Sequence, residues 1–418
     1  MARPHRAGLA ALLSLLALVA CGSPTPSAQP PPRPVPVAVA VPADAAALVA
    51  ADDRFGIDLL SAAPDGNLAI SPASVAIALQ MVATGARGTT ASQLAHVLHL
   101  RSVAAAATSA QALLAGLNAA EQDHRNTLRV ANTVWAQQGM PVAPAFSNTL
   151  RTRFASAMRT ADFASDPDGA RQQVNSTVSG QTNGLIPQLF PAGSLDGSTR
   201  LVLTNAISLA ASWATAFREK NTAPGPFTKP DGSVVQVPMM HSDQPTAEQP
   251  AAYGYAADPG YQVVTLPYVG GKLAFTILLP DTTSLTPLLG MLRDKGLPAV
   301  IGAVRPTRIA LVMPKFTIRT DLDLTATLAG LGMPAAFGAD ADFSGITTAE
   351  HLQIQTVRHD AVVQVDEHGT VAAAATGVGV QATAGVAVLP VNVNHPFLFV
   401  ITDTATGAPL FLGRITDP

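Results

Sequence analysis

The chain has 418 residues, of which 48% are hydrophobic and 13% are charged, so it is long enough to bury a large core. Its formal net charge of −3 gives no electrostatic basis for binding nucleic acid or an anionic surface. The one cysteine, Cys21, excludes an internal disulfide, and no Cys/His spacing typical of a metal site is present.

The N-terminal residues have the pattern of a secretory signal. Two arginines precede an apolar run over residues 8–20, which is short for a membrane-spanning helix. The run ends in LVAC at residues 18–21, which resembles the lipobox of bacterial lipoproteins, where the cysteine is acylated and becomes the mature N-terminus. We expect residues 1–20 to be a lipoprotein signal peptide and Cys21 to carry the lipid. A plain signal peptide with a chance cysteine and an uncleaved anchor are the alternatives.

Residues 21–43 are rich in proline and nearly uncharged, a composition that favours an extended chain over a packed one. We expect this segment to be a tether between the lipid and a single folded domain in residues 44–418. With this organisation, we expect the domain to lie in the cell envelope or outside the cell, lipid-anchored to a bacterial membrane.

Helical patterns come first in the domain. Apolar residues at helical spacing predict a helix over residues 44–63. After a short strand, Ser71 and Pro72 have the pattern of an N-cap and a first helical turn. The apolar helix that follows is predicted to end near Gly85.

Strand patterns dominate the later part of the chain. Residues rich in β-branched and aromatic side chains predict strands at 127–137 and 201–213, two strands around Gly270-Gly271, one strand over 308–318 with a bend at Pro314, and a hairpin at 395–415. Helices therefore come mainly first and strands later, with some interleaving. This order predicts one α+β domain and not a doubly wound α/β sheet.

The usual enzyme motifs are missing. The chain has no G-x-S-x-G, no H-E-x-x-H, no phosphate-binding loop and no dinucleotide fingerprint after a strand. Asp340 and Asp342 could form a metal pair, but acids in a loop are more often solvated or capping. We predict that the protein is not an enzyme and has no metal or cofactor. A catalytic triad hidden from sequence order is the remaining enzyme alternative.

Six stretches together resemble the serpin family and occur in the family's order. They are NLAISPASVAIALQMVATGARGTT, VNSTVSGQTNGLI, LVLTNAISLAASW, MPKFTI with LAGLGMPAAFGADADFSGI, HDAVVQVDEHGTVAAAAT and NHPFLFVITDTATGAPLFLGRI. They cover nearly all of the chain after the tether. The resemblance implies an α+β fold of three β-sheets and about nine helices, with an exposed reactive-centre loop at about residues 367–392.

In serpins the protease cuts this loop as a substrate, and the loop's N-terminal part then inserts as a strand into the central sheet while the acyl-enzyme is still attached. The resemblance implies that the loop hinge consists of Glu367, Gly369, Thr370, Ala372, Ala373, Ala374, Ala375 and Thr376. Small side chains without proline suit a strand that enters a closing gap. Val371 departs from the family pattern, since many members carry an acid there.

The resemblance also indicates where the protease cuts. Counting from the hinge acid Glu367 places the bond at Thr383-Ala384, and counting backwards from the NHPF motif gives Gly385, with Val386 after it. We favour the hinge count because the inserted length sets how far the protease is carried. The residues around either bond are small and neutral, which predicts an elastase-like or subtilisin-like target with a shallow pocket.

Further residues match the region where the family's central sheet opens. Ser71, Ser74, Asn205 and His359 match a hydrogen-bonded cluster beneath the strands that separate, and a polar network there can have a closed and an inserted arrangement. Helix capping by the serines and a satisfied core histidine are the simpler interpretations. Trp213 matches a tryptophan where insertion begins, and it would otherwise be a core residue.

These observations predict an inhibitor of serine endopeptidases that forms a covalent acyl complex with its target protease. We expect a monomer that meets the membrane only through its lipid anchor and binds no nucleic acid. The alternative is a non-inhibitory serpin that acts as a binding or scaffold protein and whose loop is only a substrate.

Overall fold

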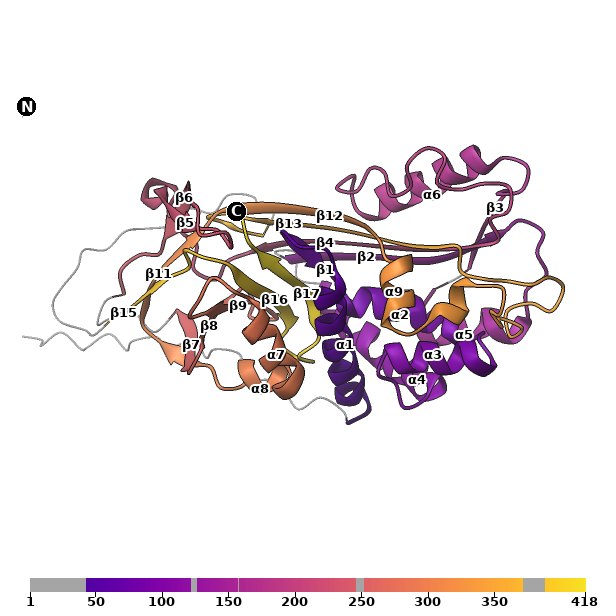
Figure 1. The fold of residues 1–418 in the computed structure, drawn as a ribbon, viewed down its shortest axis with the longest axis horizontal. Coiled ribbons are helices and arrows are strands. Elements are labelled where there is room, and N and C mark those ends of the chain that lie inside the picture. The colour runs from indigo at the N-terminus through magenta and orange to yellow at the C-terminus, as the bar shows by residue number, and fades with distance from the viewer. Residues whose placement is uncertain (1–42, 122–125, 157, 246–251, 371–387) are drawn as a thin grey trace, which may run out of the picture. The chain divides into compact units, whose positions relative to one another are not determined.

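Three β-sheets and nine α-helices make up the part of the chain that the computed structural model describes, which is residues 43–121, 126–156, 158–245, 252–370 and 388–418 (Figure 1). The helices are α1 (Ala43–Ala62), α2 (Pro72–Ala83), α3 (Gly88–Val97), α4 (Val103–Glu121), α5 (Pro144–Phe154), α6 (Pro167–Gln181), α7 (Thr286–Lys295), α8 (Leu297–Ile301) and α9 (Thr325–Leu331), with two 3₁₀ turns, η1 (Glu219–Asn221) and η2 (Pro334–Phe337). No helix in these ranges is both long and apolar enough to cross a membrane.

The central sheet has six strands. In spatial order they are β12 (Phe316–Asp323), β13 (Thr356–Val365), β14 (Gly369–Thr370), β4 (Leu201–Ser212), β2 (Asn126–Gln137) and β3 (Arg159–Ala161). Strand β14 is only two residues long, so β13 and β4 also pair directly with each other, in parallel. The long neighbouring ladders β12–β13 and β2–β4 are antiparallel, and the other parallel pairing among the described strands of this sheet is the three-residue pairing of β2 with β3.

The described residues form two further sheets, of seven and of four strands. The seven-stranded sheet has the order β1 (Leu68–Ile70), β17 (Pro409–Ile415), β16 (Phe397–Asp403), β9 (Leu273–Pro280), β8 (Tyr261–Pro267), β7 (Tyr253–Asp258) and β10 (Arg305–Thr307). The four-stranded sheet has the order β15 (Leu389–Asn392), β11 (Ile309–Pro314), β6 (Val234–His241) and β5 (Ala223–Thr228).

Helix α2 is the platform beneath the central sheet. Every residue of α2 is buried, and the helix packs against β2, β4 and β17. Figure 1 shows α6 on the opposite face of the same sheet. A helix that is apolar on all sides requires such burial, and each fully buried aliphatic side chain contributes about 1.5–3 kcal/mol.

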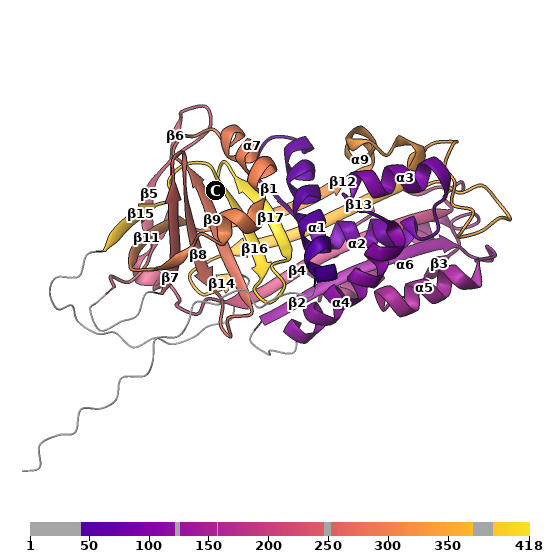
Figure 2. The ribbon, with the colours of Figure 1, turned by 90° about the horizontal axis from the view of Figure 1, so that it is seen from below.

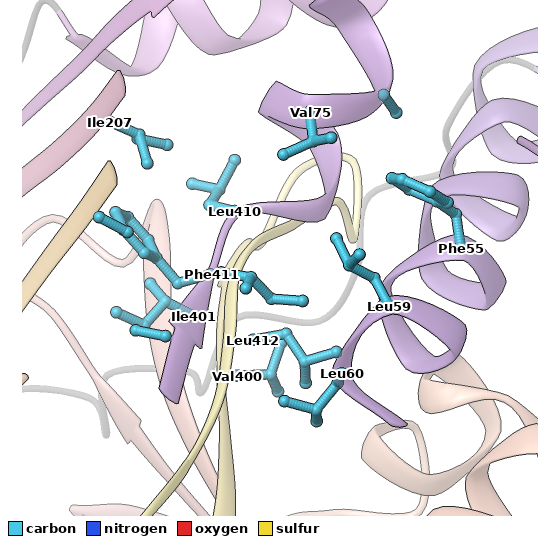
Figure 3. Close-up of a cluster of buried hydrophobic side chains, with 14 of the residues drawn as sticks. Phe55, Leu59, Leu60, Val75, Ile207, Val400, Ile401, Leu410, Phe411 and Leu412 are labelled. Atoms are coloured by element: carbon cyan, nitrogen blue, oxygen red, sulfur yellow. The ribbon is translucent and has the colours of Figure 1, made fainter. Parts of the chain in front are cut away.

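Helix α1 closes the core on the side of the seven-stranded sheet, where it lies beside β17 (Figure 2). Figure 3 shows Phe55, Leu59 and Leu60 of α1 directed toward side chains of β16 and β17. Val75 of α2 and Ile207 of β4 reach the same cluster, so one continuous core joins the two sheets (Figure 3). Helix α2 is therefore packed between the central sheet on one side and α1 with β17 on the other.

The structure confirms the predicted α+β class with three sheets and nine helices in the described ranges. Ser71 caps α2 by accepting a hydrogen bond from the backbone N–H of Ser74, and Pro72 stands in the first turn, as the sequence predicts. Helix α1 begins at Ala43, one residue inside the predicted tether. The single strand expected over 308–318 is wrong, because the chain leaves β11 at Pro314 and enters β12, in another sheet, at Phe316.

Candidate functional site

The candidate site is the seam between β13 and β4, which we define as the seven parallel residue pairs from Thr356–Val202 to Val362–Ser208. Beyond the end of the seam, β14 lies between the two strands. Thr370 pairs there with Val365 of β13 and with Ala211 of β4, antiparallel to both. The sheet is therefore closed along the seam and already holds one more strand at its end.

A buried hydrogen bond crosses the middle of the seam. His359 and Asn205 face each other in register, and His359 Nδ1 lies 2.5 Å from Asn205 Oδ1. The backbone N–H of Ser71 donates to His359 Nε2 at 3.2 Å, so Nδ1 carries the proton and donates to the amide oxygen. Burial lowers the pKa of His359 to about 3, which keeps the imidazole neutral.

The same amide ties the seam to helix α2 and strand β2. Asn205 Nδ2 donates to Ser74 Oγ and to Asn132 Oδ1, each at 2.6 Å. Ser74 Oγ donates to Asn132 Oδ1 at 2.8 Å, and Asn132 Nδ2 donates back to the Ser74 carbonyl at 3.2 Å. The structure thus brings together all four residues of the predicted cluster and adds Asn132, which sequence reasoning missed.

The cluster can exist in this form only while the sheet is closed. Neighbouring strands lie about 4.8 Å apart, so a strand inserted into the seam would move β13 and β4 to roughly twice that distance. The direct contact between His359 and Asn205 would then be broken. The cluster therefore stabilises the closed sheet, and an inserted strand has to supply new partners for both side chains.

Beyond the seam, Gly369 and Thr370 are fitted closely against β4. A Cβ atom on Gly369 would lie 2.0 Å from the carbonyl oxygen of Ala211, so only glycine fits at this position. Thr370 is fully buried, and its hydroxyl lies 2.6 Å from the hydroxyl of Tyr268. Tyr268 in turn stacks on Trp213 with ring centroids 4.6 Å apart. The stacked pair therefore holds β14 through the hydrogen bond between Tyr268 and Thr370.

The residues just before β14 are held as well. Trp213 Nε1 donates to the carbonyl of Asp366 at 2.8 Å. The Glu367 carboxylate receives hydrogen bonds from Lys315 and from the Thr222 hydroxyl, both at 2.8 Å. Burial alone raises the pKa of Glu367, but the hydrogen bonds from Lys315 and Thr222 outweigh it and lower the pKa. The hinge acid is therefore ionised and anchored at the end of the seam.

Several predicted residues lie outside the described part of the chain. These are Cys21 with residues 1–42, the hinge residues Ala372, Ala373, Ala374, Ala375 and Thr376, and the two candidate bonds Thr383-Ala384 and Gly385-Val386. At the far end of the expected loop, residues 389–392 form β15, which pairs in parallel with β11. Among the described residues, no group of three or more His, Cys, Asp or Glu could hold a metal ion.

The chain matches the model of the family described as "Serpin (serine protease inhibitor)" over residues 50–418. The chain belongs to the serpin family. Leukocyte elastase inhibitor of Bos taurus is 34% identical over 382 residues, covering 89% of this chain and 99% of that protein. Iripin-8 of Ixodes ricinus is also 34% identical, and an uncharacterized serpin-like protein of Thermococcus kodakarensis is 33% identical, with 93% and 86% of those proteins covered.

Solved serpin structures show the same fold. The thermophilic serpin tengpin in its native state has a TM-score of 0.80 at 25% identity, covering 91% of this chain and 96% of that one. A highly specific serpin of the insect Tenebrio molitor has a TM-score of 0.76 at 27% identity, covering 90% and 98%. The expectation of a serpin fold is confirmed, and the family is described as one of serine protease inhibitors, which are not enzymes.

We predict that the hydrogen bonds of Asn205 in the polar cluster contribute to the free energy of unfolding. Asn205→Ala leaves the Nδ1–H of His359 buried without a partner, which should lower the free energy of unfolding by about 1–3 kcal/mol. Asn148→Ala removes the same amide from an exposed position on α5 and should leave the free energy unchanged. Equilibrium denaturation in urea measures both. Equal midpoints for the two variants would contradict the role of the cluster in closing the sheet.

Proposed function

We propose that this serpin inhibits serine endopeptidases by inserting its cleaved reactive loop into the seam between β13 and β4 while the protease is still covalently attached. The observation that carries the proposal is the position of β14. Gly369 and Thr370 already lie between the two strands at the end of the seam, antiparallel to both. A loop released by cleavage has only to extend β14 to become a full strand.

The pairing of β14 with β13 and its pairing with β4 predict the same position in the sheet for each loop residue. Thr370 is opposite Val365 on one side and Ala211 on the other. Nine residues further along the loop, a continued β14 reaches Thr356 and Val202, which are the last pair of the seam. Residues 371–379 can thus extend β14 without a bulge, and residues 373–379 would fill the seven pairs of the seam. The sequence VAAAATGVG at these positions has no proline and no charge to obstruct a buried ladder.

The same registers give Thr376 a specific place. Six residues beyond Thr370, Thr376 falls opposite both His359 and Asn205. Directly paired residues project to the same face of a sheet, so the threonine hydroxyl would stand between the two side chains that insertion separates. A hydroxyl can accept from the imidazole N–H and donate to the amide oxygen. Thr376 therefore supplies the new partners that the opened cluster needs.

Two observations support an elastase-like or subtilisin-like target. The proposed bond Thr383-Ala384 and the alternative Gly385-Val386 present small, neutral side chains, which fit a shallow specificity pocket and not an acidic one. Curated relatives from Bos taurus and Homo sapiens, 34% and 32% identical, are named leukocyte elastase inhibitors.

We further propose that residues 1–20 are a lipoprotein signal peptide, that Cys21 is acylated, and that residues 21–43 tether a monomeric inhibitor in residues 44–418 to a bacterial membrane. The sequence LVAC at 18–21 and the proline-rich segment after it support this organisation. The intact mass of the membrane-extracted protein tests it, because lipid attachment at Cys21 adds the mass of the lipid and hydrolysis of the signal peptide removes residues 1–20. A mass equal to that of the unmodified full chain would contradict it.

The covalent trap is tested on a denaturing gel. The purified protein is mixed with pancreatic elastase, with subtilisin and with trypsin, then boiled, and the cut site is identified by mass spectrometry. We expect a band at the summed mass with elastase or subtilisin and a new N-terminus at Ala384. Cleavage in the loop without such a band would contradict inhibition and favour the alternative of a binding or scaffold protein.

A variant of the cleaved bond is the control for its assignment. Thr383→Arg should move the covalent band from elastase or subtilisin to trypsin, because an arginine side chain fits the acidic pocket of trypsin-like enzymes. If the variant keeps the original preference, the bond lies elsewhere.

The place of Thr376 is tested with a matched pair of substitutions. Thr376→Val keeps the shape but removes the hydroxyl, which would leave the His359 Nδ1–H and the Asn205 Oδ1 without a partner after insertion and should cost the cleaved form about 1–3 kcal/mol. Thr376→Ser keeps the hydroxyl and should behave like the wild type. The readout is the unfolding temperature of the loop-cleaved protein. Equal temperatures for the two variants would contradict the proposed register.

A further inference from the structure

An acidic residue of β13 lies on the opposite face of the central sheet from the polar cluster. Successive residues of a strand point to opposite faces, so Asp360 faces α6 whereas His359 faces α2 (Figure 1). Asp360 is fully buried. Ala206, its partner across the seam, belongs to an apolar cluster that joins α6 to the sheet through Val174 and Val178. A carboxyl group therefore lies beside a hydrophobic layer at the middle of the seam.

The carboxylate of Asp360 has only part of the hydrogen bonding that a buried charge requires. Arg319 of β12 donates through Nη2 to Oδ2 at 3.3 Å. Oδ1 is buried and has no hydrogen-bond donor in the described part of the chain. Asp321 stands directly opposite Asp360 in the β12–β13 ladder and carries the same charge. A buried ion that is incompletely paired destabilises the state of the protein that buries it.

The other charges near this site have partners of their own. Arg358, two residues earlier on the same face of β13, donates through Nη2 to Asp321 and not to Asp360. On α6, Arg171 is paired with Asp168 at 2.8 Å. Within the described ranges, Arg319 is therefore the one cation that pairs with Asp360.

These surroundings decide the charge of Asp360. Burial raises its pKa to about 6, against the charge and the hydrogen bond of Arg319, which lower it. Asp321 raises the pKa further, and Arg358 lowers it. The carboxyl group is thus mostly ionised at neutral pH. Because a hydrated aspartate has a pKa of about 3.9, ionisation favours any state in which water reaches the carboxylate.

The open seam is such a state. Eight antiparallel pairs join β12 to β13, so Arg319 moves together with Asp360 when β13 separates from β4. Helix α6 packs on β2 and β3 and thus belongs to the other half of the sheet, with Ala206. Separation of the strands therefore removes the apolar cover from Asp360 and leaves its ion pair intact.

We propose a positioning role for Asp360: its buried charge biases β13 away from β4 and so promotes opening of the seam. This effect belongs to the intact protein and needs no protease. Its consequence for inhibition rests on the proposed function, in which easier opening lets the cleaved loop enter before the acyl-enzyme is hydrolysed.

The pH dependence of the opening has a defined sign. Protonated Asp360 stabilises the closed sheet, so this contribution is fully present below about pH 4 and is lost as the pH rises through about 6. Since one pKa unit corresponds to a tenfold change in an equilibrium, the open state should become about tenfold more populated between about pH 5 and about pH 7.5. His359, on the other face of β13, has a pKa of about 3 and stays neutral over this range.

The test is hydrogen–deuterium exchange of the intact protein, measured by mass spectrometry in peptides from β4 and β13 and corrected for the intrinsic pH dependence of exchange. We expect protection of the seam to fall about tenfold between about pH 5 and about pH 7.5, while peptides from β16 and β17 keep their protection. Asp360→Asn should remove this pH dependence and raise seam protection by about tenfold or more at about pH 7.5.

Two further variants serve as controls. Asp360→Glu keeps the charge and should retain the fall in protection with pH. Asp294→Asn makes the same charge change at an exposed position on α7 and should behave like the wild type.

Three results would each overturn the proposal. They are a wild type without a fall in protection specific to the seam, an Asp360→Asn variant that keeps the pH dependence, and an Asp360→Asn variant whose seam is protected no more than that of the wild type at about pH 7.5. Because exchange is measured without a protease, absence of the covalent band on the denaturing gel contradicts the proposed function and leaves the role of Asp360 in opening the seam to be decided by exchange alone.

Discussion

The parallel pairing between β13 and β4 is the interaction on which the other features of this serpin depend. It joins the two halves of the central sheet through seven residue pairs, whereas eight pairs join β12 to β13 and eleven join β2 to β4. Parallel pairing is also slightly less stable per residue than antiparallel pairing. If the sheet opens, it therefore opens at this seam, and each half moves as a rigid ladder. Helix α2 beneath it is held from both sides by the core.

If the sheet opens at the seam, the polar side chains of the cluster exchange hydrogen-bond partners and do not lose them. In the closed sheet, His359 and Asn205 satisfy each other across the seam. In the proposed inserted state, the hydroxyl of Thr376 stands between them. A buried network with two satisfied arrangements can separate two stable states without leaving unpaired polar groups in either. The contacts of Glu367, Gly369 and Thr370 fix the register of β14 between β13 and β4.

Local patterns in the sequence predicted the features that depend on adjacent residues. The cap at Ser71 and Pro72 and the burial of α2 follow from a few neighbouring side chains. The four cluster residues were found only through resemblance, because their partners are far apart in the chain. Asn132 was missed because the residues around it give no sign that it faces Asn205. Its only local signal is that it is an amide within a strand of β-branched and aromatic residues. The partners of Glu367, which are Lys315 and Thr222, likewise come from distant elements.

The central claim is that cleavage converts the loop into a strand of the central sheet, and thermal unfolding of intact and loop-cleaved protein tests it most directly. Insertion adds a complete hydrogen-bonded ladder on each side of the new strand and buries its inward-facing side chains. We therefore predict that protein nicked within the reactive loop unfolds at a much higher temperature than intact protein. If the two forms unfold at the same temperature, the loop does not enter the seam, and the mechanism of inhibition proposed here is wrong.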